Sequence, residues 1–183
     1  MAQVVENLVW NSTISSNNAA NWNNTTTSND VRGTFTLGST GNFILFDLTN
    51  LSQTPTSIDS VQIKHESHAA TAGHTSVLLL EMLNGSNTQL NSEYTAFQQD
   101  SDDTIVETVR TTSNGSDAWT LDAVNTLRVK FTYVTATGPS ATTAYIDHFY
   151  AIVTYNVPDP SGGRIFISDG AVKLNNGALK IIA

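Results

Sequence analysis

The sequence predicts an all-β protein, an antiparallel β-sandwich that resembles a jelly roll, and three observations lead to this fold class. Several segments alternate apolar and polar residues with a period of two, which places successive side chains on opposite faces of a strand. Asn, Thr and Ser together make up roughly a third of the 183 residues, and these side chains favour turns and strands over helix interiors. No segment keeps a 3.6-residue period over three turns, so no long helix is expected.

The composition excludes several classes of protein. Charged residues make up 13% of the chain, which carries a net charge of −8 and has a pI near 4.7. The 8 basic residues are scattered singly, whereas binding to nucleic-acid phosphates requires clustered Lys and Arg. Cysteine is absent, which excludes a disulfide scaffold and thiolate metal sites. No apolar run approaches the roughly 18 residues of a membrane span, so neither a nucleic acid nor a membrane is expected as a partner.

Residues 1–31 are predicted to form an extended N-terminal arm. Residues 11–30 are a low-complexity tract of Asn, Ser and Thr, whose composition cannot bury a core by itself. Trp10 and Trp22 stand in this segment either as anchors on a partner's surface or as residues that pack on their own domain. The first ten residues contain neither a cationic stretch nor a long apolar run, so no cleaved secretion signal is expected.

Residues 32–156 are predicted to form the sandwich, which begins with short strands separated by turns. Residues 34–37 and 43–48 are apolar segments on either side of a Gly-Ser-Thr-Gly turn at 38–41. Residues 60–67 (SVQIKHES) alternate apolar and polar side chains, which predicts a strand with one face toward water. The run VLLLEML at 77–83 is apolar on both faces, as in a central strand, and the Asn84-Gly85 dipeptide after it predicts a hairpin turn.

The later strands of the predicted sandwich show the clearest patterns. Residues 104–109 (TIVETV) predict a strand, and the Asn-Gly dipeptide at 114–115 predicts a turn. Residues 127–134 (LRVKFTYV) and 144–155 (AYIDHFYAIVTY) alternate along their whole length. Short strands at regular spacing, separated by Gly, Asn and Ser turns, are typical of a β-sandwich, and a jelly roll is the favoured variety. One face of the last strand is expected to carry Tyr145, Asp147, Phe149, Ala151, Val153 and Tyr155.

Residues 157–183 are predicted to form a hinge and a small C-terminal β-meander. The hinge sequence VPDPSGG contains two of the 4 prolines of the chain. Three short strands are expected at 164–168, 171–174 and 178–182, joined by Asp-Gly and Asn-Asn-Gly turns. A meander of about 20 residues is too small to be stable alone, so it must dock on its own sandwich or on another subunit or protein, and an intermolecular role is favoured. The predicted partner-binding residues are Trp10, Trp22, Ile165, Phe166, Ile167, Val172, Leu174, Leu179 and Ile181.

No pattern in the sequence indicates a catalytic residue, a cofactor or a metal ligand. His65 and His68 are three residues apart in a predicted strand, so their side chains are expected on opposite faces, and they lack the helical spacing that brings two imidazoles to one metal. The acidic cluster at 100–103 lacks the Gly and Glu of a calcium-binding EF-hand loop. There is no nucleophile elbow or phosphate loop. A His–carboxylate pair facing a pocket, or two facing carboxylates, would favour an enzyme; the strand carboxylates are Glu66, Glu81, Glu107 and Asp147.

The stretch 58–155 resembles a recurrent β-sandwich of tailed-bacteriophage virion proteins. The resemblance rests on the strand IDSVQI at 58–63, the Gly-containing loop at Gly73, the apolar strand at 77–83, Trp119 and the closing strand at 145–155. The segments RIFISDG at 164–170 and AVKL at 171–174 resemble short C-terminal segments of such proteins. The resemblance covers about two thirds of the chain. It implies a jelly-roll-like domain that decorates a capsid or belongs to a tail or fibre, usually as an oligomer.

Two functions are expected from these patterns. The first is a capsid decoration (cement) protein that binds the outer surface of a phage head and stabilises it, with the major capsid protein or other virion proteins as partners and a homodimer or homotrimer as the oligomer. The alternative is a tail-fibre or receptor-binding module that binds carbohydrate. Either protein would be made in the host cytoplasm and reach the surface of the phage particle. The candidate sugar-stacking residues are Trp22, Tyr94, Trp119 and Tyr133, and core packing is favoured for the last two.

Overall fold

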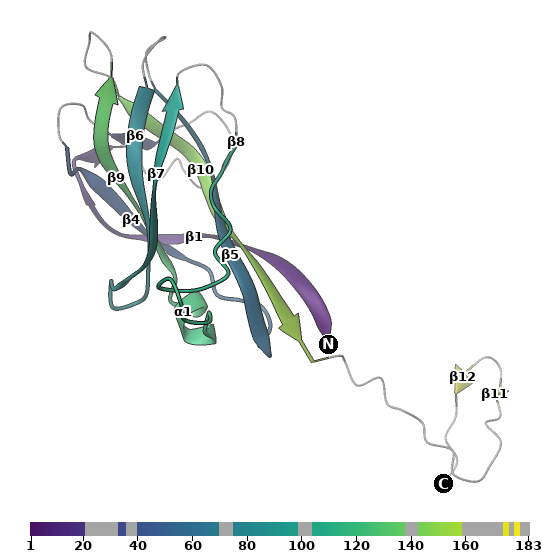
Figure 1. Cartoon of the computed structure of the whole chain (residues 1–183). Helices are drawn as coiled ribbons and strands as arrows, with labels where there is room; N and C mark the ends of the chain where they lie inside the picture. Colours follow the sequence, from purple (N-terminus) through teal and green to yellow (C-terminus); the bar gives the residue numbers. More distant parts are fainter. Residues whose placement is uncertain are drawn as a thin grey trace.

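The computed structural model describes residues 1–20, 33–35, 40–69, 75–98, 104–137, 143–158, 174–175 and 178–179 (Figure 1). These residues form antiparallel strands almost throughout, which confirms the all-β prediction. The strands are β1 (Ala2–Asn17), β2 (Ala19–Ala20), β3 (Gly33–Phe35), β4 (Phe43–Leu48), β5 (Ser57–Ala69), β6 (Thr75–Leu83), β7 (Gln89–Gln98), β8 (Thr104–Val106), β9 (Arg128–Thr137), β10 (Ala144–Val157), β11 (Leu174–Asn175) and β12 (Ala178–Leu179), and the helix among them is α1 (Leu121–Asn125).

The strands are arranged in two sheets that pack face to face as a jelly roll. The first sheet has the order β1-β10-β5-β8, and the second sheet has the order β4-β9-β6-β7. Along the chain the strands therefore pass back and forth between the sheets, which is the connectivity of a jelly roll and confirms the predicted variety of sandwich. The short strands β2 and β3 extend the first sheet beside the start of β10.

The N-terminal segment differs from the predicted arm, because β1 is a strand of both sheets. Residues 2–9 pair with β10, and residues 10–17 pair with β4 through two register shifts. Leu8 is fully buried in the core, and the hydroxyl of Tyr155 donates a 2.6 Å hydrogen bond to Glu6. Burial and this hydrogen bond to the Glu6 carboxylate raise the pKa of Tyr155. Residues 2–17 are thus part of the sandwich rather than an arm that leaves it.

The core lies between the two sheets and is centred on three phenylalanine rings. Phe46 on β4, Phe131 on β9 and Phe149 on β10 are fully buried, with ring centroids 4.5 to 6.4 Å apart. These separations and the edge-on angles are those at which aromatic quadrupoles attract. The alternation predicted for β10 is confirmed from Asp147 onward. A register shift between Ile146 and His148 reverses it before that point, so that Ala144 and Ile146 are also buried.

Turns and a short helix close one end of the sandwich. Asn114 and Gly115 have φ values of 50° and 80°, in the left-handed region that Asn and Gly adopt most readily. This confirms the predicted turn, which brings Ser113 to Asp117. The Thr120 side chain caps α1 by accepting a hydrogen bond from the Ala123 amide. Within the described residues, no helix is long and apolar enough to cross a membrane.

Two of the three strands predicted for the C-terminal meander fall within the described residues. β11 and β12 pair with Leu174 opposite Leu179 and Asn175 opposite Ala178, on either side of the predicted Asn-Asn-Gly turn. Of the predicted ranges 171–174 and 178–182, the structure describes Leu174, Ala178 and Leu179. The predicted strand at 164–168 and the hinge from residue 159 onward lie outside the described residues.

Candidate functional site

A buried histidine–carboxylate pair lies between the two sheets. The His65 side chain on β5 is fully buried, the Glu107 side chain is 8% exposed, and Nε2 of His65 lies 2.5 Å from Oε1 of Glu107. The other ring nitrogen, Nδ1, is 2.7 Å from the hydroxyl oxygen of Ser67. Nε2–H of the imidazole donates to the Glu107 carboxylate and Nδ1 is hydrogen-bonded to the Ser67 hydroxyl, so both nitrogens are satisfied. The ring also packs edge-on against Phe131, at a centroid distance of 5.5 Å.

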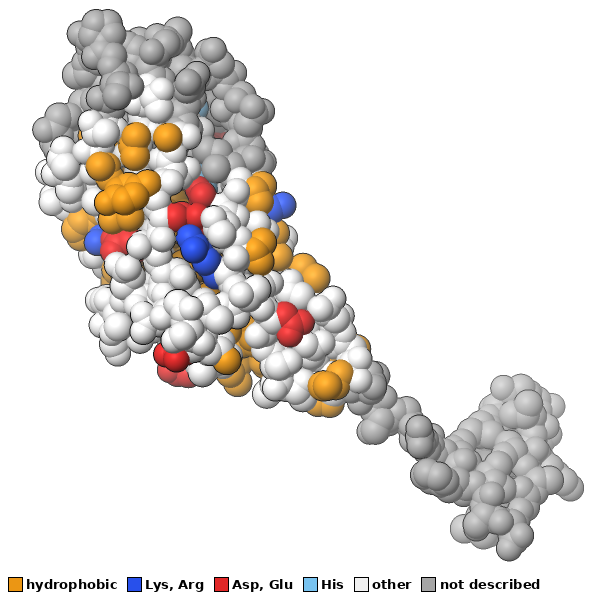
Figure 2. Space-filling view, viewed as in Figure 1, with side chains coloured by type: hydrophobic (Ala, Val, Ile, Leu, Met, Phe, Trp, Pro, Cys, Tyr) orange, Lys and Arg blue, Asp and Glu red, His pale blue; other side chains and the backbone are white. Residues whose placement is uncertain are grey.

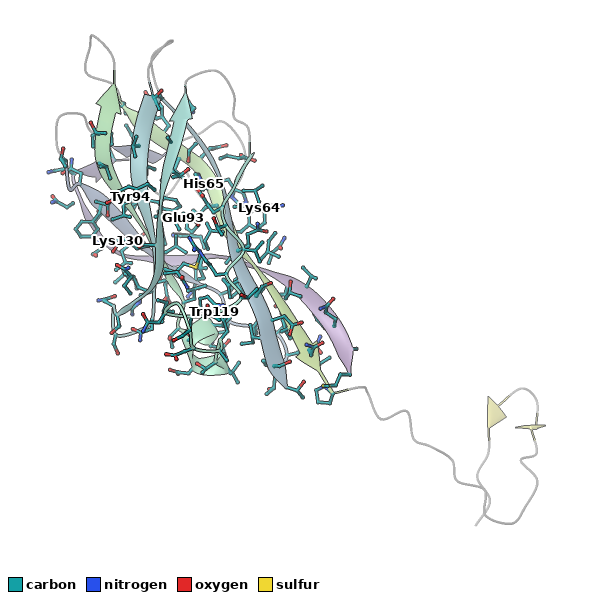
Figure 3. The ribbon with its side chains drawn as sticks, in the orientation of Figure 1. Lys64, His65, Glu93, Tyr94, Trp119 and Lys130 are labelled. Carbon is teal, nitrogen blue, oxygen red and sulfur yellow. The ribbon has the colours of Figure 1, made fainter. Side chains whose placement is uncertain are left out.

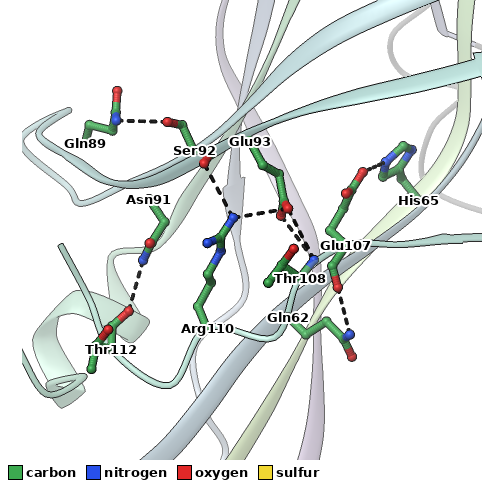
Figure 4. Close-up of polar contacts among 10 residues, drawn as sticks. All are labelled: Gln62, His65, Gln89, Asn91, Ser92, Glu93, Glu107, Thr108, Arg110 and Thr112. Atoms are coloured by element: carbon green, nitrogen blue, oxygen red, sulfur yellow. Dashed lines mark hydrogen bonds and ion pairs between the residues drawn. The ribbon is translucent and has the colours of Figure 1, made fainter. Parts of the chain in front are cut away.

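Glu107 begins a strap, residues 107–113, that connects the first sheet to the second (Figure 4). On the side of the first sheet, Gln62 donates to the Glu107 carbonyl, and Val61 and Arg110 exchange backbone hydrogen bonds. On the side of β7, the Arg110 guanidinium forms a 3.1 Å ion pair with Glu93. The strap therefore closes the open side of the sandwich between β5 and β7.

Burial and neighbouring side chains from β5, β7 and the strap together determine the pKa of Glu107. Burial raises the pKa of a carboxyl group, but here the hydrogen bond and charge of His65 oppose burial, together with a hydrogen bond from Thr95 and the charge of Arg110. The sum of these effects holds the pKa of Glu107 below its ordinary value, so the carboxylate is ionised at neutral pH. Removing one partner would leave a buried charge or a buried polar atom unpaired, which is costly.

The Ser67–His65–Glu107 arrangement contains residue types that serve in acid–base catalysis, and all three residues are buried. Ser67 is 3% exposed, His65 1% and Glu107 8%, and a general base must lie within hydrogen-bond reach of the proton it abstracts. Glu107 was one of four strand carboxylates in the sequence, but its pairing with His65 could not be identified from the sequence.

The outward face of the second sheet has a different character. Tyr94 on β7 is 70% exposed and lies directly opposite Leu79 on β6. Figure 2 shows hydrophobic side chains gathered over β6 and β7 at this position. We call this surface the Tyr94 face; across the strands it comprises the partly or fully exposed residues Phe43, Val77, Leu79, Glu81, Ser92, Tyr94, Ala96, Lys130 and Thr132.

The charges on the Tyr94 face are paired with one another. Lys130 donates a 2.8 Å hydrogen bond to Glu81, and its ammonium group lies 5.2 Å from the centre of the Phe43 ring. Figure 3 shows Lys130 and Tyr94 on the same side of the sandwich. The charges of Lys130 and Glu81 cancel. The face therefore presents a large aromatic ring, aliphatic surface and short polar groups without an uncompensated charge.

The four predicted sugar-stacking residues differ in their exposure to solvent, where the structure describes them. Trp119 is 5% exposed and donates its indole N–H to the Arg110 carbonyl at 2.8 Å. Tyr133 is 3% exposed. Both belong to the core, as the sequence favoured, whereas Tyr94 is at the surface. Trp22 lies outside the described residues.

The predicted partner-binding residues are only partly covered by the structure. Trp10 on β1 is half-buried and packs against the sandwich core. Leu174 and Leu179 lie opposite each other in β11 and β12. The remaining residues lie outside the described part of the chain: Trp22, Ile165, Phe166, Ile167, Val172 and Ile181. Among the described residues, no group of three His, Cys, Asp or Glu could hold a metal ion.

Comparisons with known proteins report similarity in fold alone. No family model and no curated protein matches the sequence. A truncated AlyQ with CBM32 and alginate lyase domains superposes with a TM-score of 0.54 at 15% identity, over 85% of this chain and 35% of that one. The chain thus spans about a third of the length of that protein. The enzymatically active domain of bacteriophage CBA120 tailspike protein 4 gives a TM-score of 0.32 at 9% identity, over 85% of this chain and 19% of that one, which is too low to carry an argument.

Proposed function

We propose that this chain is a carbohydrate-binding module without catalytic activity, of the kind that a phage tail fibre or another receptor-binding part would carry. The observation that carries the proposal is the Tyr94 ring, 70% exposed on a flat sheet face and flanked by Leu79 and Ser92. The shared fold with a chain that contains a CBM32 domain, a class of carbohydrate-binding module, supports it. The buried position of His65 and Glu107 supports the absence of catalysis.

The physical basis of binding is the apolar face of a sugar ring. Pyranose C–H groups can cover an aromatic ring, and removing roughly 60 Å² of apolar surface from water contributes about 1.5 kcal/mol. This corresponds to a factor of about ten in affinity per stacked ring. The neighbouring Ser92 hydroxyl and the Glu81 carboxylate can bond to sugar hydroxyls and set the orientation.

The charge distribution favours a neutral glycan over an acidic one. The chain has a net charge of −8, and Lys130 on the Tyr94 face is already paired with Glu81. The carboxylates of a polyuronate would be repelled by the negative charge of the protein. Lys130 would not offset this repulsion at short range, because its charge is already compensated by Glu81. A neutral hexose polymer incurs no such cost.

Replacing Tyr94 with alanine is expected to weaken binding to a neutral glycan by about tenfold or more, because the stacking surface is lost. The measurement is a glycan array with neutral and acidic polymers, followed by calorimetric titration of the best neutral ligand. Tyr94→Phe keeps the ring and is expected to retain most of the affinity. Val5→Ala, at an exposed residue of the first sheet, is the matched control and is expected to change nothing. Binding that is unchanged in Tyr94→Ala, or that is confined to polyuronates, would contradict the proposal.

Capsid decoration stays a prediction with less structural support. Residues 2–17 of the predicted N-terminal arm are strands of the sandwich and are therefore not free to reach a neighbouring subunit. The hypothesis predicts that the purified protein co-sediments with phage heads that lack it, and an absence of co-sedimentation would count against it.

A further inference from the structure

The outward face of the first sheet has a row of side chains that runs across four strands. Val9 on β1 lies opposite Tyr150 on β10, Tyr150 opposite Lys64 on β5, and Lys64 opposite Val106 on β8. Val9 is 43% exposed and Val106 52% exposed, and Tyr150 and Lys64 are partly exposed. The row therefore reads apolar, aromatic, cationic, apolar from one side of the sheet to the other.

Lys64 differs from the other described cations because it has no ion pair. Arg110 pairs with Glu93, Arg128 with Asp47 and Lys130 with Glu81, at distances of 2.8 to 3.6 Å. Among the basic side chains in the described part of the chain, Lys64 alone lacks a carboxylate partner. Figure 3 shows it on the side of the sandwich opposite to Tyr94 and Lys130. A cation beside apolar surface is stabilised when an aromatic ring or an anion packs against it.

The next row along the strands contains a second complementary pair. His148 on β10 lies opposite Glu66 on β5, and the His148 ring is 5.5 Å from the ring of Tyr150. Lys64 and Glu66 give this part of the face no net charge, in contrast to the −8 of the whole chain. The electrostatic repulsion between two acidic copies is therefore low at this surface.

We propose that a second copy of the chain docks on this face, with a twofold axis parallel to the strands and between β10 and β5. A rotation about this axis places β5 of one copy over β10 of the other and β8 over β1. Each row of side chains keeps its height along the strands, so a row of one copy faces the same row of the other. Tyr150 of one copy then faces Lys64 of the other, Val9 faces Val106, and His148 faces Glu66. Each cation meets a ring and each valine meets a valine, so the surface is complementary to itself.

The size of the face suits a modest dimer. β10 and β5 pair over 12 positions, and they are flanked by residues 2–9 of β1 and by the three residues of β8. With strands about 4.8 Å apart and a rise of about 3.3 Å per residue, these strands cover roughly 550 Å² per copy. This is below the roughly 800 Å² per partner of a standard interface. A dissociation constant in the micromolar range is expected. Because Tyr94 lies on the other sheet, docking would leave both Tyr94 faces exposed on opposite sides of the dimer.

The absence of cysteine allows a direct test by site-specific cross-linking. The single variants Val9→Cys and Val106→Cys are mixed in equal amounts and treated with a short bis-maleimide. The mixture is expected to give a covalent dimer, whereas each variant alone is not, because equal positions lie about 14 Å apart laterally across the sheet. Tyr94→Cys, at an exposed site on the opposite sheet, is the control and is expected to stay monomeric. Equal cross-linking in the separate variants and the mixture, or through Tyr94→Cys, would overturn the proposal.

The role of Lys64 is tested by sedimentation velocity of the unlabelled chain across a concentration series. Lys64→Glu places a carboxylate over the tyrosine ring and is expected to raise the dissociation constant at least tenfold. Lys64→Arg retains a cation over the ring and is expected to preserve the dimer. Tyr94→Ala should weaken glycan binding and leave the dimer intact, which separates this inference from the proposed function. A chain that stays monomeric up to several hundred micromolar, or a dimer indifferent to Lys64→Glu, would overturn it.

Discussion

Replacement of Phe131 by alanine is expected to lower the free energy of unfolding by about 4 kcal/mol, because it empties the centre of the core. Phe131 is fully buried, and its ring contacts those of Phe46, Phe149 and His65 at centroid distances of 5.4 to 6.4 Å. The loss combines the transfer of the ring to water with the cavity that remains between two rigid sheets. Urea unfolding followed by tryptophan fluorescence measures it, with the midpoint shifting at an unchanged slope.

A graded substitution at the same position serves as the control. Phe131→Leu keeps most of the apolar volume and is expected to cost about 1 to 2 kcal/mol. The contrast between the two variants isolates the aromatic contacts from simple hydrophobicity. If alanine costs under about 1 kcal/mol, the rings do not form the centre of the core.

Replacement of Glu107 by glutamine is expected to destabilise the protein by about 2 kcal/mol at pH 7, since it weakens hydrogen bonds to a buried carboxylate. The pKa of Glu107 is lowered in the folded state, so the unfolded chain binds the proton more tightly. The stabilisation is therefore fully present above the unfolded pKa of about 4.3 and is lost as the pH falls through the lower folded pKa. The difference between Glu107→Gln and the unmodified chain should shrink in acid, as unfolding curves between pH 7 and pH 3 would measure.

The control for this prediction is another glutamate near the same histidine. Glu66 follows His65 on β5 but points to the outward face of the first sheet. Glu66→Gln, measured on dilute protein, is expected to change stability by less than about 0.5 kcal/mol. A stability difference for Glu107→Gln that is constant over the whole pH range would show that its carboxylate does not carry the effect.

The sequence predicted those strands whose inner faces are apolar. β6, β9 and β10 alternate or run apolar over their whole length, and the structure confirms each of them. Most of their inward side chains are apolar and buried, so the hydrophobic pattern indicates each strand directly. The register shift in β10 could not be predicted, because Asp147 continues the alternation in the sequence while the backbone bulges there.

Strands that face polar neighbours gave a weaker signal. β7 has Glu93 and Thr95 on its inner side, where Arg110 and Glu107 of the strap bond to them. Such a strand has no apolar alternation, and the partners lie far away in the sequence. β1 was not predicted as a strand for a similar reason. Its second half is rich in Asn, Ser and Thr and forms the edge of the second sheet beside β4.

The candidate binding surfaces could be predicted only as residue types. Tyr94 was one of four candidate aromatic residues, and nothing in its local sequence distinguishes it from the buried Tyr133. The outward position of Lys64 follows from the alternation in β5. Its neighbours Tyr150 and Val106 depend on strand order and register, which arise from long-range pairing rather than from local pattern.

The double membership of β1 has a consequence for synthesis on the ribosome. Ala2 lies opposite Val157. The backbone hydrogen bonds between β1 and β10 therefore cannot form until β10 has been synthesised, about 155 residues after β1 begins. At about 5 to 20 residues per second, this delay lasts roughly 8 to 30 s. Such distant pairings also fold slowly once the chain is complete. During this interval β4 and the nascent first strand expose hydrogen-bonding edges, and chaperones rather than the unfinished fold must keep neighbouring copies apart.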